Sequence, residues 1–138
     1  DLHKAIRRQR QMCIRDSANW LKTQPAVTKV IYPGLPEHPG YEIMKKQARG
    51  FGSMLTFYVD NKEHAFEILE KVRMIKFAES LGGVETLLTY PTTQTHADVP
   101  QEIREKNGIT DCTLRLSVGI EDARDLIAEL TQVFAELS

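Results

Sequence analysis

The segment Cys112–Glu121, with the sequence Cys-Thr-Leu-Arg-Leu-Ser-Val-Gly-Ile-Glu, most constrains the fold of this chain. Its apolar residues alternate with polar ones, which is typical of a β-strand with one face in a hydrophobic core. Residues 123–137 then keep one apolar face, as an amphipathic helix does. Glu121 and Asp122 precede this helix, where negative charge is favourable. A half-buried strand that leads directly into such a helix indicates a sheet covered by helices.

Arg115 lies in the middle of this strand and brings a permanent positive charge into the apolar alternation. A charge in a half-buried strand costs free energy unless an anion meets it. The planar guanidinium fits a carboxylate through two parallel hydrogen bonds. Two explanations stay open on this segment alone. A structural ion pair or an outward-facing arginine is favoured by how arginines usually occur, and a ligand-carboxylate site is the other.

The rest of the chain alternates irregularly between strands and helices. Runs of β-branched, aromatic or other apolar residues predict extended segments at 27–32, 53–59, 75–78 and 84–90. Apolar periodicity and capping residues predict helices at 41–49, from Asp60 or Asn61 to about 72, at 101–106 and at 123–137. We expect an α+β domain with a mainly antiparallel sheet of about four strands and helices on one face.

Composition and residue spacing exclude several classes of protein. The 138 residues, 41% of them hydrophobic, fit one globular domain with a core, and the net charge of -1 argues against a nucleic-acid partner. Two cysteines and four scattered histidines lack the spacing of a disulfide framework or a metal site. No secretory signal opens the chain and no apolar run is long enough for a membrane span. We therefore expect a cytoplasmic protein without metal, nucleic acid or membrane partners.

Polar islands in apolar surroundings are the candidates for chemistry: Glu79–Gly83, Pro91–His96 and Arg115. Adjacent glycines permit backbone conformations closed to other residues and let a ligand approach the main chain, although an ordinary turn explains them as well. The threonine-rich second island is either a hydroxyl-lined site or a simple loop. No glycine-rich phosphate loop or catalytic triad is recognisable.

Five ordered motifs carry a family resemblance. They are Tyr32–Pro39 (Tyr-Pro-Gly-Leu-Pro-Glu-His-Pro), Gly50-Phe-Gly52, Glu79–Glu85, Pro91 with Thr95-His96, and Leu114–Asp122. From about Ala18 to its end, the chain resembles the C-terminal domain of the pyridoxal phosphate-dependent enzymes of Cys/Met metabolism. This transsulfuration family includes cystathionine β- and γ-lyase, cystathionine γ-synthase, methionine γ-lyase and O-acylhomoserine sulfhydrylase. The resemblance implies the C-terminal small domain of a fold type I, aspartate aminotransferase-like enzyme.

The resemblance also implies roles for four residues. Arg115 matches the arginine that binds the α-carboxylate of the amino-acid substrate. Ser80 matches a serine that lies beside the Schiff-base lysine and helps to hold the same carboxylate. Glu79 and Thr95 match supporting positions near the active site. A glutamate at position 79 is usual in the γ-acting members, whereas some β-lyases carry an aromatic residue there.

Two departures from the family pattern lead to further expectations. The family's Schiff-base lysine and the residues that hold the cofactor phosphate belong to a large N-terminal domain, and no lysine of this sequence lies in the expected motif. We therefore expect no catalytic residue in this chain, pyridoxal 5'-phosphate bound mainly by the large domain, and no activity of the chain alone. Residues 1–17 resemble the family poorly, and we hypothesise an atypical leader, foreign or misassembled, before the domain at 18–138.

The implied function is that of a substrate-carboxylate-binding domain of a transsulfuration enzyme in methionine and cysteine metabolism. A cystathionine lyase or a cystathionine γ-synthase fits best. Glu79 favours γ-type chemistry, whereas residues 90–108 resemble bacterial enzymes labelled as β-lyases or γ-synthases. The implied partners are a sulfur-containing amino acid such as cystathionine, the chain's own large domain and the other subunits of a homotetramer. The alternative is a non-catalytic small-molecule-binding or oligomerisation module derived from the same fold.

Overall fold

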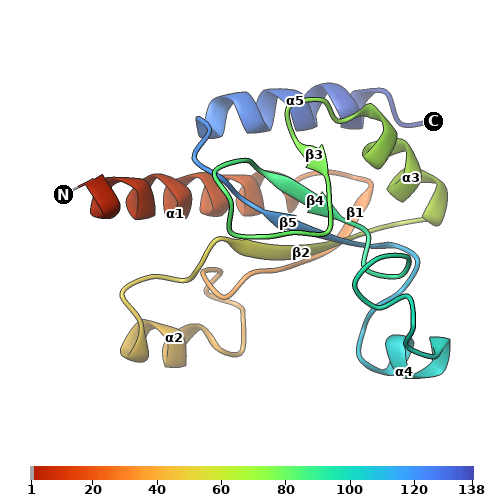
Figure 1. Cartoon of the computed structure of the whole chain (residues 1–138), viewed down its shortest axis with the longest axis horizontal. Helices are drawn as coiled ribbons and strands as arrows, with labels where there is room; N and C mark the ends of the chain where they lie inside the picture. Colours follow the sequence, from red (N-terminus) through yellow and green to blue (C-terminus); the bar gives the residue numbers. More distant parts are fainter. Residues whose placement is uncertain (1) are drawn as a thin grey trace.

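Five strands form one sheet at the centre of the fold (Figure 1). The computed structural model describes residues 2–138. In their order across the sheet, the strands are β1 (Val27–Ile31), β2 (Met54–Val59), β5 (Thr113–Ser117), β4 (Leu87–Thr89) and β3 (Lys76–Phe77). Neighbouring strands are antiparallel except β3 and β4, which are parallel. The strand that carries Arg115 is therefore the middle one.

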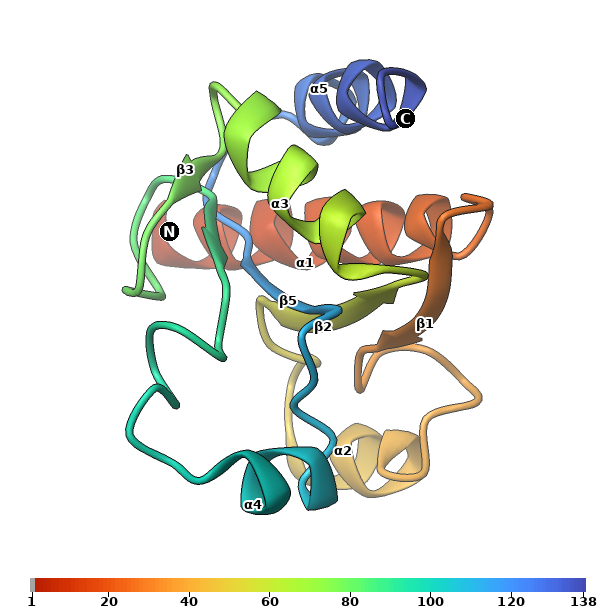
Figure 2. The ribbon, with the colours of Figure 1, turned by 90° about the vertical axis from the view of Figure 1, so that its right-hand side faces the viewer.

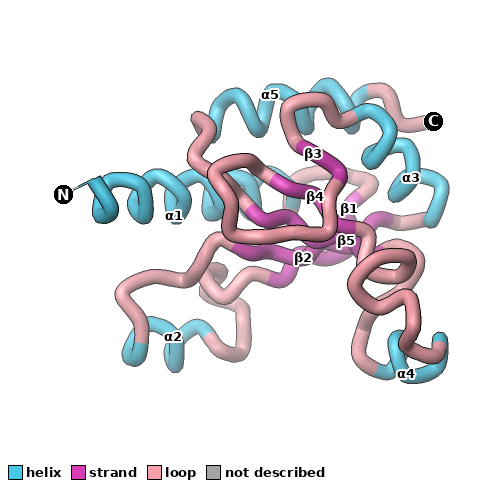
Figure 3. Tube along the Cα trace, viewed as in Figure 1, coloured by secondary structure: helices cyan, strands magenta, loops and turns pink. Residues whose placement is uncertain are grey.

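The longer helices lie together on one side of this sheet (Figure 2). They are α1 (Leu2–Leu21), α3 (Lys62–Lys71) and α5 (Ala123–Ala135). The short helices α2 (Tyr41–Gln47) and α4 (Gln101–Lys106) lie on the other side, at the ends of long loops (Figure 3). The sheet thus has one face covered by helices, as expected, and an opposite face bordered mainly by loops.

The hydrophobic core fills the space between the sheet and the three longer helices. Side chains along a strand alternate between the two faces, so β2 and β5 each supply one set of buried apolar residues. The core members from the strands are Leu55, Phe57, Val59, Leu88, Leu114 and Leu116, and those from the helices include Ile14, Leu21, Ile68, Leu126 and Leu130. The residues between them on β2 and β5, including Arg115, consequently belong to the opposite face.

The predicted α+β class is confirmed and the sheet is mainly antiparallel, as expected, but it has five strands instead of about four and one parallel pair. The structure has a fifth strand, β3, which makes the sheet mixed. The Glu129 carboxylate on α5 accepts hydrogen bonds from the backbone N–H groups of Arg73, Met74 and Ile75, at 2.5, 2.6 and 2.8 Å. These bonds turn the chain after α3 toward the sheet, and Lys76 then donates from its backbone to Thr86. Strand β4 is also shorter than the predicted segment 84–90.

Helix α1 is continuous over residues 2–21. Its buried residues, Cys13, Ile14, Ser17, Ala18 and Leu21, all lie in its C-terminal half. The N-terminal half projects beyond the sheet (Figure 1). Among residues 2–138, no helix combines the length and apolarity that a membrane span requires.

Asp122 caps the start of α5, and this cap predicts a pH dependence. Its carboxylate pairs with the Arg124 guanidinium at 2.9 Å and accepts the Arg124 backbone N–H at 2.9 Å. These contacts lower the pKa of Asp122 from its ordinary 3.8 to about 2. Because the folded-state pKa is the lower one, the contribution of Asp122 to stability is complete above pH 3.8 and is lost as the pH falls through about 2.

We expect Asp122→Asn to remove this part of the pH dependence and to keep the cap, since asparagine is an equally good N-cap residue. Thermal unfolding followed by circular dichroism over this pH interval tests the expectation. The difference in melting temperature between the two proteins should shrink toward acid pH. A difference that stays constant with pH would contradict the role of the carboxylate charge.

Candidate functional site

Arg115 lies at the centre of the sheet, between two threonines on the neighbouring strands. Its cross-strand partners are Thr56 on β2 and Thr89 on β4. The flanking residues Leu114 and Leu116 are fully buried against the helices, so the side chain of Arg115 extends from the opposite face of the sheet. The side chain is half-buried there. The core packing of β5 therefore fixes the direction of the guanidinium.

The guanidinium is anchored through one nitrogen and leaves the others without a partner. Arg115 Nη2 donates to the backbone oxygen of Glu79 at 3.0 Å and to Oγ1 of Thr89 at 3.1 Å. Among residues 2–138, nothing accepts a hydrogen bond from the buried Nε, and Nη1 makes no hydrogen bond or ion pair. A buried donor without an acceptor costs about 1–3 kcal/mol. Arg115 is thus not part of a structural ion pair within the described chain, and its free donors suit an anion.

The loop that carries Glu79 and Ser80 is held at several points on this face. Besides the contact of Glu79 with Arg115, the backbone N–H of Gly82 donates to Ser117 Oγ on β5 at 3.0 Å. Gly82 has a φ of +74°, a left-handed conformation that favours glycine. Arg10 on α1 donates to the carbonyl oxygens of Gly82 and Gly83. The side chains of Glu79 and Ser80 themselves are exposed.

The far end of this loop is fixed by Glu121. Its two carboxylate oxygens accept the backbone N–H of Thr86 at 2.6 Å and the Thr86 hydroxyl at 2.7 Å. The same hydroxyl accepts the backbone N–H of Gly119 at 2.9 Å. A Cβ atom at position 119 would lie 2.2 Å from the carbonyl oxygen of Val84, so only glycine fits this close approach. Loop and strand end are therefore joined by a charged network.

The structure places Thr95 in a separate hydrogen-bonded group. Its Oγ1 lies 2.8 Å from Nδ1 of His96, and Arg104 on α4 donates to the carbonyl oxygens of Thr92 and His96 at 2.8 and 3.4 Å. None of these described contacts reaches Arg115. Of the four residues singled out by sequence, the structure thus joins Arg115 with the main chain at Glu79, sets Ser80 next to it along the chain, and leaves Thr95 apart.

Sequence reasoning missed Thr89, although its hydroxyl touches the guanidinium directly. Thr89 is completely buried and also donates from Oγ1 to the backbone oxygen of Ala78 at 2.7 Å. The only available signal was a hydroxyl residue at the end of the apolar run Leu87–Leu88. Threonine is common in strands for steric reasons, so that signal has little weight by itself.

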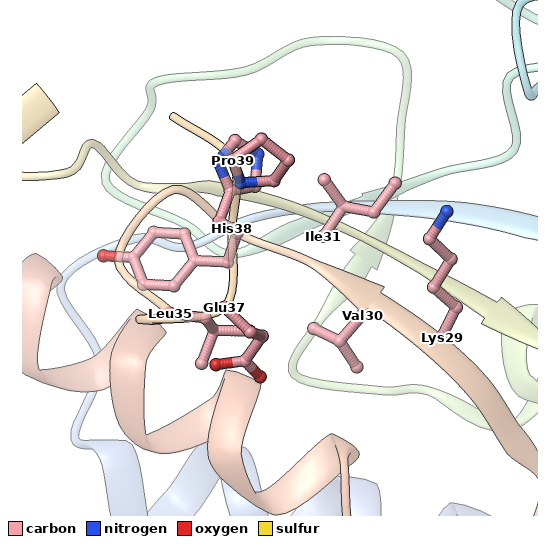
Figure 4. A pocket seen from close by; sticks show the side chains of 8 residues that line it. Lys29, Val30, Ile31, Leu35, Glu37, His38 and Pro39 are labelled. Atoms are coloured by element: carbon pink, nitrogen blue, oxygen red, sulfur yellow. The ribbon is translucent and has the colours of Figure 1, made fainter. Parts of the chain in front are cut away.

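A pocket of about 470 Å³ lies beside β1, in the family-like segment that follows it (Figure 4). Val30, Ile31 and Leu35 contribute an apolar lining, and Lys29 and Glu37 contribute charges. Neither Arg115 nor the loop of Glu79 and Ser80 lines this pocket. It is therefore a separate feature from the arginine site.

Comparison with known proteins identifies the family. Residues 3–135 match the family model described as Cys/Met metabolism PLP-dependent enzyme. The chain belongs to this family. It is 50% identical over 115 residues to a cystathionine γ-lyase of Dictyostelium discoideum, a match of 83% of this chain and 30% of that protein. It is 47% identical over 121 residues to a cystathionine β-lyase of Bacillus subtilis, with 88% of this chain and 31% of that protein covered.

Solved structures of this family share the fold. A cystathionine γ-lyase from Lactobacillus plantarum, complexed with L-serine, superposes with a TM-score of 0.89 at 39% identity, over 94% of this chain and 34% of that one. A cystathionine γ-synthase from Xanthomonas oryzae, in complex with cystathionine, gives a TM-score of 0.88 at 37% identity, over 93% and 33% of the two chains. The family resemblance and its fold are thus confirmed. The chain spans about 30% of the length of the curated relatives it matches.

The members of this family depend on pyridoxal phosphate, and the fit of the described residues to that chemistry is partial. A similar structure, a putative O-acetylhomoserine (thiol)-lyase from Campylobacter jejuni, contains a pyridoxyl-lysine phosphate group. In the chain described here, the unpartnered buried Nε of Arg115 would fit the carboxylate of an amino-acid substrate. The arginine face therefore fits the substrate end of the cofactor complex.

The hydrogen bonds of Glu121 to Thr86 indicate that Glu121 keeps the loop at residues 79–86 ordered. Glu121→Ala should speed hydrogen exchange of the Gly82 and Thr86 amides by about tenfold or more, because hydrogen bonds to a charged group contribute about 1.5–3 kcal/mol. Exchange within α3 should not change. Glu85→Ala is the matched control, since Glu85 is an exposed glutamate in the same loop. Equal exchange in the two variants would show that Glu121 does not hold the loop.

Proposed function

We propose that the whole protein is a pyridoxal phosphate-dependent transsulfuration enzyme, a cystathionine lyase or cystathionine γ-synthase. We propose further that this chain is the domain that binds the α-carboxylate of its substrate. The observation that carries the proposal is the guanidinium of Arg115, which contacts two neutral oxygens and keeps Nε and Nη1 without a partner among the described residues. The identity to cystathionine β- and γ-lyases supports the reaction class.

The role of Arg115 in this proposal is to orient the substrate. Pyridoxal phosphate, when bound, withdraws electrons from the substrate and so eases the cleavage of bonds at and beyond Cα. Arg115 would bind the carboxylate and thereby restrict rotation about the bond between the substrate's Cα and its nitrogen, so that the bond to be broken is presented in one fixed orientation. An arginine keeps its proton in proteins, so Arg115 contributes binding and orientation but no proton transfer.

The neighbouring residues have supporting roles. Ser80 follows the anchored residue Glu79, and its exposed hydroxyl is available as a second hydrogen-bond donor to the same carboxylate. The Glu79 side chain is exposed beside it, and a glutamate at this position favours γ-type chemistry in this proposal. Thr95 keeps only a weaker supporting role in this proposal, because its hydrogen-bonded group with His96 does not reach Arg115.

The substrate and the assembly follow from the same proposal. A sulfur-containing amino acid such as cystathionine is the substrate class, because the related γ-synthase structure contains cystathionine. The proposed partners are the chain's own large domain, which supplies the cofactor-binding residues, and further subunits in a cytoplasmic homotetramer. The boundary at residue 18, between a domain at 18–138 and an atypical leader at 1–17, stays a prediction. The family match that begins at residue 3 and the unbroken helix α1 count against it. The complete coding sequence tests the boundary, since a family helix that continues upstream of residue 18 would contradict it.

Arg115→Lys in the whole enzyme tests the proposed function. Lysine keeps the charge but loses the planar fork, so we expect KM for cystathionine to rise at least tenfold, which is about 1.4 kcal/mol of binding free energy. The visible absorbance of the bound cofactor should not change. Arg124→Lys is the matched control, because this exposed arginine pairs only with Asp122. An unchanged KM in Arg115→Lys would contradict the role of Arg115, and absence of any cofactor absorbance in the whole protein would favour a non-catalytic module.

A further inference from the structure

Thr89 connects the two parts of the proposed site through a single hydroxyl group. It is completely buried at the end of β4, directly opposite Arg115 on β5. Its Oγ1 lies 3.1 Å from Nη2 of Arg115 and 2.7 Å from the backbone oxygen of Ala78. Ala78 immediately precedes Glu79, whose own carbonyl oxygen accepts from the same Nη2. The hydroxyl therefore lies between the guanidinium and the chain that leads to Ser80.

The chemistry of the three groups fixes the direction of these hydrogen bonds. A guanidinium can only donate, and a carbonyl oxygen can only accept. The hydroxyl proton of Thr89 must therefore point to Ala78, which leaves an oxygen lone pair toward Arg115. The hydroxyl has no freedom to reverse, because the opposite direction would place two donors against each other. Thr89 thus acts as a fixed acceptor for Nη2 in a place that water does not reach.

The surrounding strands keep this arrangement rigid. Ala78 donates from its backbone to Leu88 at 3.0 Å, so the segment before Glu79 is tied to the strand that carries Thr89. The register of β4 against β5 then places Thr89 opposite Arg115. The backbone contacts of Ala78, Glu79 and Leu88 and the side chain of Thr89 consequently set the distance between the guanidinium and the loop of Ser80.

Thr56 occupies the equivalent place on the other side of Arg115 and has no such contact. It is the cross-strand partner of Arg115 on β2 and is half-buried. No hydrogen bond joins its hydroxyl to Arg115 among the described residues. The guanidinium is thus held from the β4 side only, and the two threonines form a matched pair of the same residue type.

We infer that Thr89 is a positioning residue of the active site, whose hydroxyl orients Arg115 so that the remaining guanidinium donors meet the substrate carboxylate. This inference rests on the proposed function, because it assigns the task of Thr89 through Arg115. Thr89 itself touches no substrate atom. It lowers the freedom of a flexible side chain before the substrate arrives, and such preorganisation strengthens binding without any new contact.

The test uses the whole enzyme with its cofactor and cystathionine as substrate. Thr89→Val keeps the shape of the side chain and removes the hydroxyl, whereas Thr89→Ser keeps the hydroxyl. We expect Thr89→Val to raise KM about tenfold with kcat within about twofold, since it weakens carboxylate binding in the ground state and the transition state alike. Thr89→Ser and the control Thr56→Val should keep KM within about twofold of the wild-type value. Thr89→Ala gives the same comparison if the valine variant does not fold.

A double-variant cycle decides whether Thr89 acts through Arg115. If it does, Thr89→Val should add little to the effect of Arg115→Lys, because the group that it positions is already altered. The same increase in KM in both backgrounds would overturn the inference. So would a wild-type KM in Thr89→Val while Arg115→Lys raises KM, although the proposed function would then stand. An unchanged KM in Arg115→Lys would instead contradict the proposed function itself.

Discussion

The hydrogen bonds from Nη2 of Arg115 to Glu79 and Thr89 are the contacts on which the polar face of this sheet depends. They join the middle strand, its neighbour β4 and the loop that begins at Ala78. Both acceptors are neutral, so they orient the guanidinium without compensating its charge. A half-buried charge without a counter-ion is unfavourable. A bound carboxylate would supply the missing negative charge and accept the free hydrogen-bond donors of the guanidinium.

The two faces of the sheet have different roles, since one packs into the hydrophobic core and the other carries the candidate site. On one face, Leu114 and Leu116 pack against α1, α3 and α5 and hold β5 in place. On the other face, the same strand presents Thr113, Arg115 and Ser117, of which Arg115 and Ser117 hold the Glu79–Gly83 loop. A strand that is fixed by its apolar side chains provides a rigid support for polar side chains on its other face. The alternation of β5 is therefore the physical origin of the site.

Local patterns predicted much of this structure, and long-range contacts account for what they missed. The alternation of β5 and the apolar stripe of α5 are visible in the sequence because each depends on neighbouring residues. The extended segment at 75–78 is visible as well, but its parallel pairing with β4 is not, since it depends on Glu129 of α5, which accepts three backbone N–H groups of the chain after α3. Likewise, Glu121 was expected to favour the start of α5 by its charge, whereas its carboxylate instead binds Thr86 in the preceding loop.

The residues of the proposed site differ in the same way in how far the sequence reveals them. Arg115 stands out in sequence because a charge interrupts an apolar strand, and Ser80 because it precedes two glycines. Thr89 does not stand out, because a threonine in a strand needs no explanation. Its importance arises from the register of β4 against β5, which brings its hydroxyl to Nη2, and no local pattern specifies that register.

The anchoring of Glu79 through its main chain has a consequence for the proposed function, because it leaves the side chain of residue 79 independent of the contact with Arg115. The carbonyl oxygen of residue 79 holds Arg115, while the side chain of Glu79 is exposed and makes no described hydrogen bond with it. Any residue at this position offers the same carbonyl, so the side chain is free to differ without disturbing the arginine. A common carboxylate-binding arrangement is therefore compatible with relatives that carry out β- and γ-lyase reactions. Under the proposed function, the carbonyl oxygen of residue 79 supports the arginine that binds the α-carboxylate common to these substrates, and the side chain of residue 79 is the part that can differ between reaction types.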